Sequence, residues 1–204
     1  MINIYNQDCL EAMKEMSDNQ FDLAIVDPPY GINVKLKVFN DGKNWDTEIP
    51  PKQYFDELFR VSKNQIIWGG NYFLDYLGAT NTMIIWDKLN TDIGRKWTCE
   101  IAWTNFKKNS CIIKAERAGE HGFYTVDCKR IHPTQKPVKL YEWLLMNYAK
   151  EGDTILDTHL GSGSIAIACH NLGYDLTGYE IDKEYFEAAQ KRINIHKQQK
   201  RLFI

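Results

Sequence analysis

The chain has 204 residues, a formal net charge of −2, 44% hydrophobic residues and 25% charged residues, which predicts a single soluble globular domain over residues 1–204. The small negative charge weighs against a dedicated nucleic-acid binder, which is usually basic overall, and no apolar run approaches the roughly 20 residues of a membrane helix. Five cysteines without a CxxC pair, in a chain without an export signal, predict reduced thiols, a cytoplasmic protein and no metal site.

The first half of the chain alternates strand-like and helix-like segments. FDLAIV at residues 21–26 is apolar at almost every position, which predicts a strand covered on both faces. Asp8, followed by Glu11, forms a capping box that predicts a helix start. In order, we expect a strand at 1–6, a helix at 8–17, the strand at 21–26, a loop at 31–49, a helix at 50–64, a strand at 65–68, a turn at 69–73, a short helix at 73–78, and strands at 82–86 and 99–103.

The second half continues this alternation after an irregular stretch. We expect a helix at 138–152, a strand at 153–157, a glycine-rich turn at 158–164, a helix at 165–173, a strand at 174–182 and a helix at 183–199. Strands that alternate with helices predict an α/β fold with a doubly wound, mostly parallel, Rossmann-like sheet. The strands at 82–86 and 99–103 are joined only by a loop, which predicts an antiparallel hairpin at one edge of that sheet.

The segment DTHLGSGS at residues 157–164 carries the signal for a cofactor. Gly161 and Gly163 lie between an expected strand and helix, where glycine allows the backbone to approach a ligand. Glu180 follows Gly161 by 19 residues (180 − 161), close to the spacing at which an acid binds ribose hydroxyls in dinucleotide-binding folds. The third glycine of that fingerprint is missing, and Asp157 favours a cationic ligand, so S-adenosylmethionine (SAM) fits better than NAD or FAD. An ordinary turn remains the alternative.

The tetrapeptide Asp27-Pro28-Pro29-Tyr30 directly follows the apolar strand at 21–26. Ligands bind at the carboxyl ends of strands in doubly wound sheets, so Asp27 is expected at a binding edge. Proline has no N–H group and a fixed φ, which holds the Pro28 carbonyl in place. Asp27 and that carbonyl would accept hydrogen bonds from one amino group, while Tyr30 would stack on a planar base. The alternative is a turn closed by prolines with a tyrosine on the surface.

The order of these motifs resembles that of the DNA amino-methyltransferases with the permuted, beta-type arrangement. DPPY comes first, HPTQKP at 132–137 follows, and the glycine-rich loop comes last. The resemblance covers nearly the whole chain and implies that DPPY is the catalytic tetrapeptide. The residues that it implies for SAM binding are Asp8 at the adenine ring; His132, Thr134, Gln135 and Lys136 beside the methionine part, with Thr134 and Lys136 nearest its carboxylate; Asp157, Gly161, Ser162 and Gly163 in the loop; and Glu180 at the ribose.

Two further positions bear on this resemblance. The family usually has Asp-Pro-Phe where this chain has Asp157, Thr158 and His159, so a histidine replaces an aromatic residue that packs beside the cofactor. Of the properties that the resemblance implies, the affinity for the cofactor is the one that this departure is expected to change. Asn71, in the segment IIWGGNYF at residues 66–73, is expected near the active site because that segment resembles the family's strand after the catalytic motif.

The resemblance implies a site-specific DNA methyltransferase that transfers a methyl group from SAM to the exocyclic amine of an adenine flipped out of duplex DNA. A cytosine amino-methyltransferase is the first alternative, although such enzymes more often begin the tetrapeptide with serine. The second alternative is a catalytically silent subunit of a methyltransferase assembly that binds DNA or SAM. No Pro-Cys pair occurs in the chain, so covalent catalysis through cysteine is not supported.

Double-stranded DNA is the expected partner, and the loops at 31–49 and 104–131 are the expected segments for minimal DNA recognition and closure. We expect the part of the first loop at 31–46 to be mobile without DNA. A membrane is not an expected partner; a homodimer, a partner nuclease and a role in restriction–modification stay open. The expected DNA contacts are Lys35, Lys37, Lys43, Lys107, Lys108, Lys114, Arg117, Lys129 and Arg130.

Overall fold

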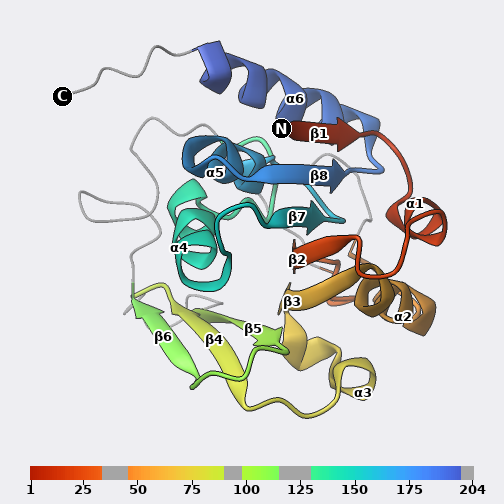
Figure 1. The fold of residues 1–204 in the computed structure, drawn as a ribbon, viewed down its shortest axis with the longest axis vertical. Helices are drawn as coiled ribbons and strands as arrows, with labels where there is room; N and C mark the ends of the chain where they lie inside the picture. The colour runs from red at the N-terminus through yellow and green to blue at the C-terminus, as the bar shows by residue number, and fades with distance from the viewer. Residues whose placement is uncertain (34–45, 90–97, 115–129, 199–204) are drawn as a thin grey trace.

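The computed structural model describes residues 1–33, 46–89, 98–114 and 130–198 (Figure 1). The strands in these residues are β1 (Ile2–Tyr5), β2 (Phe21–Val26), β3 (Ser62–Trp68), β4 (Thr82–Asp87), β5 (Cys99–Thr104), β6 (Cys111–Lys114), β7 (Thr154–Asp157) and β8 (Asp175–Tyr179). They form one eight-stranded sheet in the order β1-β8-β7-β2-β3-β5-β4-β6. β5 runs antiparallel to both neighbours, and the other neighbouring pairs are parallel. The predicted α/β fold with a mostly parallel sheet is confirmed.

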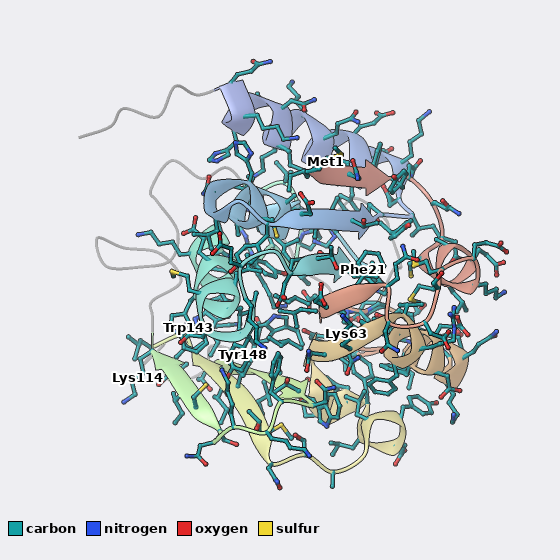
Figure 2. All side chains as sticks on the ribbon, in the orientation of Figure 1. Met1, Phe21, Lys63, Lys114, Trp143 and Tyr148 are labelled. Atoms are coloured by element: carbon teal, nitrogen blue, oxygen red, sulfur yellow. The ribbon has the colours of Figure 1, made fainter. Side chains whose placement is uncertain are left out.

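Helices cover both faces of the sheet. They are α1 (Cys9–Lys14), α2 (Lys52–Val61), the 3₁₀ turn η1 (Gly70–Tyr72), α3 (Leu74–Leu77), α4 (Val138–Tyr148), α5 (Ser164–Leu172) and α6 (Lys183–Gln198). The first three α-helices pack on one face, and α4, α5 and α6 pack on the other. Figure 2 shows the side chains that fill the space between these layers. Among the described residues, no helix has the length and apolar character needed to span a bilayer.

β2 lies in the middle of this arrangement and has the bounds that its sequence predicts. Leu23 and Ile25 belong to the hydrophobic cluster under α4 and α5. Ala24 and Val26 belong to the cluster under α1 and α2. Because successive side chains of a strand point to opposite faces, this division confirms that β2 is covered on both sides and explains why its sequence has no polar alternation.

The far end of the sheet differs from the expectation in one respect. β4 and β5 pair antiparallel as predicted, but the outer strand is β6, within the stretch 104–131 that was expected to be a loop. β6 pairs with β4 in parallel, and its Ile113 is buried against the core under α4. β3 also begins at Ser62, directly after α2, three residues before the predicted strand start.

The central pair of strands, β7 and β2, marks a topological switch point. Leu156 of β7 pairs with Ala24 of β2. From β7 the chain continues to β8 on one side of this pair, and from β2 it continues to β3 on the other side. Asp157 ends β7, and Asp27 directly follows β2. Crevices at such switch points are the usual ligand sites of doubly wound sheets, so the fold places both predicted motifs at one such crevice.

Candidate active site

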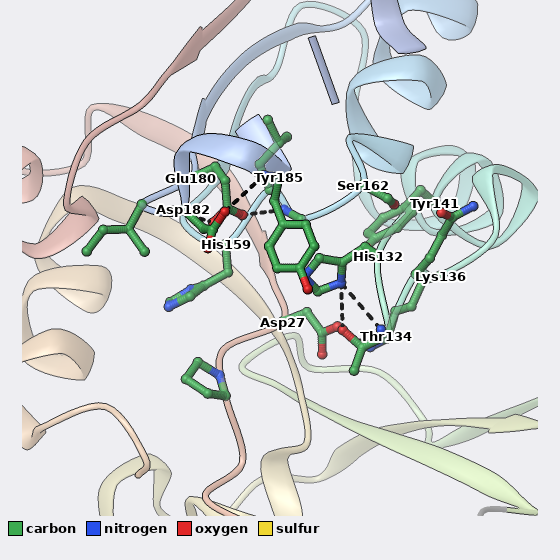
Figure 3. Close-up of a pocket in the computed structure, with 15 residues that line it drawn as sticks. Asp27, His132, Thr134, Lys136, Tyr141, His159, Ser162, Glu180, Asp182 and Tyr185 are labelled. Carbon is green, nitrogen blue, oxygen red and sulfur yellow. Dashed lines mark hydrogen bonds and ion pairs between the residues drawn. The ribbon is translucent and has the colours of Figure 1, made fainter. Parts of the chain in front are cut away.

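A cavity of about 180 Å³ lies at this switch point (Figure 3). Four chain segments line it: the tetrapeptide after β2, the segment before α4 with the first turn of that helix, the loop after β7, and the turn between β8 and α6 with the first turn of α6. Its lining residues are Asp27, Pro29, His132, Thr134, Gln135, Lys136, Tyr141, His159, Leu160, Gly161, Ser162, Glu180, Ile181, Asp182 and Tyr185. The two predicted motifs therefore share one cavity, although more than 100 residues separate them in sequence.

The glycine-rich loop is held by contacts from β8 and α6. The backbone N–H of Gly161 donates to Oε2 of Glu180 at 2.8 Å. Gly163 has a φ of +70°, and a Cβ atom there would lie 2.9 Å from Ile193 of α6, so both its backbone conformation and its close packing require glycine. Arg192 donates from Nη1 to the Ser162 carbonyl at 2.8 Å. Gly161 faces the cavity, whereas Gly163 has a structural role at the start of α5.

Both carboxylate oxygens of Glu180 accept backbone hydrogen bonds in this site. Its Oε1 accepts the backbone N–H of Asp182 at 2.9 Å, while its Oε2 accepts that of Gly161. Each carboxylate oxygen can accept more than one hydrogen bond, and Glu180 also lines the cavity. The carboxylate is therefore fixed in position and can still accept from a ligand hydroxyl, as its predicted role at the ribose requires.

Asp157 is almost fully buried at the end of β7. Its Oδ1 accepts the backbone N–H of His159 at 3.0 Å. Burial raises the pKa of Asp157 to about 8; the hydrogen bond from His159 lowers that pKa, and the negative charges of Asp27 and Glu180 raise it. A cationic ligand would favour the ionised carboxylate.

The histidine that replaces the family's aromatic residue is hydrogen-bonded to the Thr158 hydroxyl, which is itself bonded to a second hydroxyl. Nδ1 of His159 lies 2.9 Å from Oγ1 of Thr158, which in turn lies 2.7 Å from the Tyr54 hydroxyl of α2. Burial lowers the pKa of His159 to about 4, so the ring is neutral at pH 7. His159 lines the cavity, as expected for a residue beside the cofactor.

The segment HPTQKP lines the opposite wall. His132 packs edge-on against Tyr185 of α6, with ring centroids 4.3 Å apart. Its Nδ1 lies 3.3 Å from the backbone N–H of Thr134 and 3.2 Å from the Thr134 hydroxyl. The side chain of Gln135 is buried and accepts the backbone N–H of Ile131 at 3.0 Å. These contacts give the wall a fixed shape.

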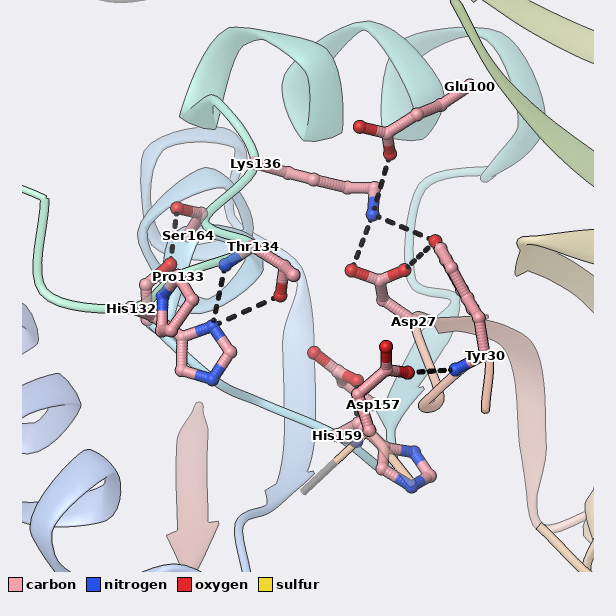
Figure 4. Close-up of polar contacts among 12 residues, drawn as sticks. Asp27, Tyr30, Glu100, His132, Pro133, Thr134, Lys136, Asp157, His159 and Ser164 are labelled. Carbon is pink, nitrogen blue, oxygen red and sulfur yellow. Dashed lines mark hydrogen bonds and ion pairs between the residues drawn. The ribbon is translucent and has the colours of Figure 1, made fainter. Parts of the chain in front are cut away.

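Lys136, the last polar residue of that segment, points to the tetrapeptide (Figure 4). Its Nζ lies 2.5 Å from Oδ2 of Asp27 and 3.1 Å from Oε2 of Glu100. The second carboxylate oxygen of Glu100 lies 2.5 Å from Nζ of Lys88. The Tyr30 hydroxyl donates to Oδ1 of Asp27 at 2.5 Å. The predicted contact of Lys136 with the SAM carboxylate stays a prediction, because the ammonium group is bound to two protein carboxylates here.

The charges in this cluster shift one another's pKa values. Burial raises the pKa of Asp27, and the ammonium of Lys136 offsets only part of that effect. Burial would also raise the pKa of Glu100, but the ammonium groups of Lys136 and Lys88 outweigh it and hold that pKa at about 2. Burial opposes the charge of Lys136, and the two carboxylates more than compensate, so its pKa is raised. Lys136 is therefore charged at pH 7.

The ring of Tyr30 is already packed on one side. It stacks on Tyr72 of η1 with centroids 5.0 Å apart and an interplanar angle of 17°. A Cβ atom at Gly69 would lie 2.2 Å from the Tyr30 ring. The backbone N–H groups of Tyr30 and Gly31 both donate to Oδ1 of Asp46, which fixes the turn after the tetrapeptide. Stacking of a base on Tyr30 stays a prediction, and it has to use the part of the ring that Tyr72 leaves free.

Six predicted residues are not among those that line the cavity: Tyr30, Asp157 and Gly163, described above, and Asp8, Pro28 and Asn71. Asp8 is the N-cap of α1, where its Oδ1 accepts the backbone N–H of Leu10 at 2.7 Å. Pro28 is buried. Asn71 is exposed in η1. The predicted roles of these residues in binding stay predictions.

The predicted DNA contacts divide into two groups. Lys107 and Lys114 are exposed. Nζ of Lys108 donates to the Asn147 carbonyl at 2.7 Å and lies 4.5 Å from the centre of the Tyr148 ring, so part of its binding capacity is used within the fold. Nη2 of Arg130 donates to the Pro133 carbonyl at 2.9 Å. The remaining predicted contacts, Lys35, Lys37, Lys43, Arg117 and Lys129, and most of the loop at 31–49, including its predicted mobility, lie outside the described residues.

Several site residues have no counterpart in the sequence-based prediction. Asp46, Glu100 and Tyr54 contact motif residues 16 to 104 positions away, and Lys88 contacts Glu100. Only Glu100 carried a local signal, because an acid inside the apolar strand sequence CEIAW is expected to be buried with a partner.

Comparisons with known proteins agree with this geometry. A model of the family described as DNA methylase matches residues 75–191, more than half of the chain. The type II methyltransferase M.HpaI of Haemophilus parainfluenzae is 24% identical over 230 residues, which cover 91% of this chain and 72% of that protein.

Two solved structures show the same fold. The M1.HpyAVI–SAM complex has a TM-score of 0.65 and 23% identity, over 95% of this chain and 100% of that one. The PvuII DNA methyltransferase, a cytosine-N4-specific enzyme, has a TM-score of 0.64 and 14% identity, over 100% of this chain and 88% of that one. With a site built around DPPY and a match over most of its length, the chain belongs to the DNA methylase family.

Proposed function

We propose that this protein transfers a methyl group from SAM to the exocyclic amine of an adenine flipped out of duplex DNA. The observation that carries the proposal is that Asp27 and Pro29 line the same cavity as Gly161 and Glu180. A group that accepts hydrogen bonds from an amine thus lies beside a loop suited to a nucleoside, and methyl transfer requires the two ligands to be adjacent.

SAM fits the carboxylate groups at the cavity. Its adenosine part carries ribose hydroxyls, which a fixed carboxylate such as Glu180 can accept. Its sulfonium and ammonium groups are positive, and they would relieve the unfavourable charge of the buried Asp157 carboxylate. When bound, SAM supplies a methyl group on a positively charged sulfur. M1.HpyAVI has been solved as a complex with SAM, which supports the same cofactor here.

Asp27 serves as a hydrogen-bond acceptor for the target amine. The lone pair of an adenine amine is delocalised into the ring, so the free amine is a weak nucleophile. Hydrogen bonds from its N–H groups to Asp27 and to the Pro28 carbonyl would localise that pair and stabilise the positive charge that develops on nitrogen. Both acceptors are rigid, because Pro28 has a fixed φ and Tyr30 holds Asp27 through its hydroxyl.

The DNA substrate has to open for this chemistry. The amine of a paired base points into the duplex, so the base must leave the stack at a cost of a few kcal/mol. Tyr30 would recover part of that cost by stacking. The segments 31–49 and 104–131, with their lysine and arginine residues, are the proposed contacts with DNA, within a single methyltransferase domain.

Cytosine is the second candidate base, because a cytosine-N4-specific enzyme shares the fold over the whole chain. Adenine is preferred since the tetrapeptide begins with aspartate, whereas cytosine amino-methyltransferases more often begin it with serine. Both bases present an exocyclic amine to the same acceptors, so the reaction is the same at the level of the protein groups.

A transfer assay with tritium-labelled SAM and plain duplex DNA tests the proposal. We expect incorporation of label into DNA, and nucleoside analysis of the product should yield N6-methyladenine. Asp27→Ala should abolish turnover, because the amine loses its acceptor, while SAM binding is retained. Asp22→Ala, at the opposite end of β2, is the matched control and should keep its activity. N4-methylcytosine would establish the second candidate instead, and no label from an intact protein would indicate a silent subunit.

A further inference from the structure

The Lys136 ammonium group uses all three of its N–H bonds inside the site. They reach Oδ2 of Asp27 at 2.5 Å, Oε2 of Glu100 at 3.1 Å and the hydroxyl of Tyr30 at 3.4 Å. The side chain of Lys136 is only 3% exposed. A lysine is rarely buried to this extent unless its charge is paired. Here two of the three partners are Asp27 itself and Tyr30, which donates to Asp27.

These contacts orient Asp27 without exhausting its capacity as an acceptor. Oδ1 accepts from Tyr30 and Oδ2 accepts from Lys136. An ionised carboxylate offers about four lone pairs, so two remain for a substrate amine. Because Lys136 and Tyr30 bind different oxygens, the plane of the carboxylate is fixed.

Glu100 reaches this site because of the direction of its strand. β5 runs antiparallel between β3 and β4, so its first residues lie where the parallel strands end. Ala102 pairs with Trp68, the last residue of β3, and Glu100 pairs with Trp86 near the end of β4. Lys88, just beyond β4, holds the other oxygen of Glu100 at 2.5 Å. Glu100 is thereby anchored, and it shares the Lys136 ammonium group with Asp27, which lies nearer to that group.

We propose that Lys136 and Glu100 are opposing positioning residues for methyl transfer: Lys136 keeps the Asp27 carboxylate negatively charged and turned toward the target amine, and Glu100 weakens that hold. This inference rests on the proposed function, since it assigns Asp27 as the acceptor for the amine. The ion pair with Lys136 favours the ionised form of Asp27, which is the form that accepts hydrogen bonds from an amine.

The charges around Asp27 define the expected signs. Lys136 approaches from the segment before α4, Glu100 from β5, Tyr30 from the tetrapeptide itself, and Asp157 from β7. Lys136 lowers the pKa of Asp27, whereas burial and Glu100 raise it. Removing the lysine charge should therefore favour the protonated, inactive acid, and removing the glutamate charge should favour the active carboxylate.

Two isosteric changes test these signs in the full-length protein. Lys136→Met should move the acidic limb of the methyl-transfer rate to higher pH by about 1–3 pH units, the range for loss of an opposite charge at this distance. Glu100→Gln should move that limb to lower pH. Lys136→Arg keeps the charge and should restore most of the wild-type profile. Glu57→Gln is the matched control: Glu57 is paired with Arg60 at 2.6 Å and is 20% exposed, close to the 23% of Glu100.

Carboxyl ¹³C NMR of Asp27, assigned with Asp27→Asn, supplies a readout that does not require turnover. Its titration should shift up in Lys136→Met and down in Glu100→Gln. Shifts of the same sign in both variants, or no shift in either, would overturn the proposal. If Lys136→Met does not fold, the Glu100→Gln and Lys136→Arg titrations still decide the sign. Absence of methyl transfer by the wild-type protein would refute the proposed function. The NMR titration would still test whether Lys136 and Glu100 shift the pKa of Asp27 in opposite directions.

Discussion

The buried carboxyl of Asp157 predicts that SAM affinity depends on pH. Burial and the neighbouring carboxylates raise its pKa to about 8, so at pH 7 the free protein holds a proton there. A cationic ligand favours the ionised form and lowers that pKa. Binding of SAM should therefore release a proton, and the affinity should rise with pH until the pKa of the free protein is reached.

The size of the effect follows from the same value. With a pKa of about 8, roughly one molecule in eleven is ionised at pH 7, and ionising the rest costs about 1.4 kcal/mol, or tenfold in affinity. At pH 6 the cost is about 2.7 kcal/mol. The affinity should thus increase about 50-fold between pH 6 and pH 8, as long as the pKa of the complex lies below 6, and it should rise only about twofold further above pH 8 before it levels off.

Isothermal titration calorimetry with SAM, in buffers that differ in ionisation enthalpy, measures both the affinity and the protons released. SAM also has an α-amino group that titrates near pH 8, so the comparison is made with Asp157→Asn, which keeps an acceptor for the His159 N–H group and cannot ionise. The ratio of wild-type to variant affinity should carry the full pH dependence. Asp22→Asn is the control, because the pKa of Asp22 is about 2 and this group stays ionised throughout. Parallel curves for wild type and Asp157→Asn would refute the reasoning.

Two stability predictions concern residues that support the site. Gly69→Ala places a Cβ 2.2 Å from the Tyr30 ring at a φ of +71° and should lower the free energy of unfolding by about 3 kcal/mol or more. Gly173 is also left-handed but has open space around its Cβ, so Gly173→Ala should lower that free energy by only about 1 kcal/mol. Equal losses for the two variants in urea denaturation would contradict the packing argument. Thr158→Val leaves the buried Tyr54 hydroxyl without its partner at 2.7 Å and should lower the free energy of unfolding by about 1–3 kcal/mol, which the same denaturation experiment measures.

The sequence predicts the central elements of the fold because their signals are local. FDLAIV is a buried run bounded by turn residues, and β2 has the same bounds. Asp8 caps α1 as its spacing predicts, although Glu11 pairs with Lys14 instead of completing the capping box. The glycine loop and Glu180 also follow a spacing rule, and the structure joins them by a hydrogen bond.

The remaining features depend on contacts that no local pattern records. β6 has four residues, and it becomes a strand because β4 offers a pairing edge 27 residues earlier in the chain. Lys136 belongs to the segment HPTQKP, and the family resemblance implies that it contacts the cofactor. Its ammonium group nevertheless binds Asp27, 109 residues away (136 − 27). Nothing in either segment alone shows that these two charges will meet, because the meeting depends on the order of strands in the sheet.

The antiparallel strand explains why the acceptor half of the site is harder to infer than the cofactor half. In an all-parallel sheet, only residues at the ends of strands reach the carboxyl edge. The expected site residues therefore lie at the ends of apolar runs, as Asp27, Asp157 and Glu180 do. β5 runs in the opposite direction and brings the start of a strand to that edge. Glu100 is the second residue of β5, and it lies within the charged cluster for that reason. An acid near the start of a strand that is joined by a loop to its antiparallel neighbour is therefore also a candidate site residue in a mostly parallel sheet.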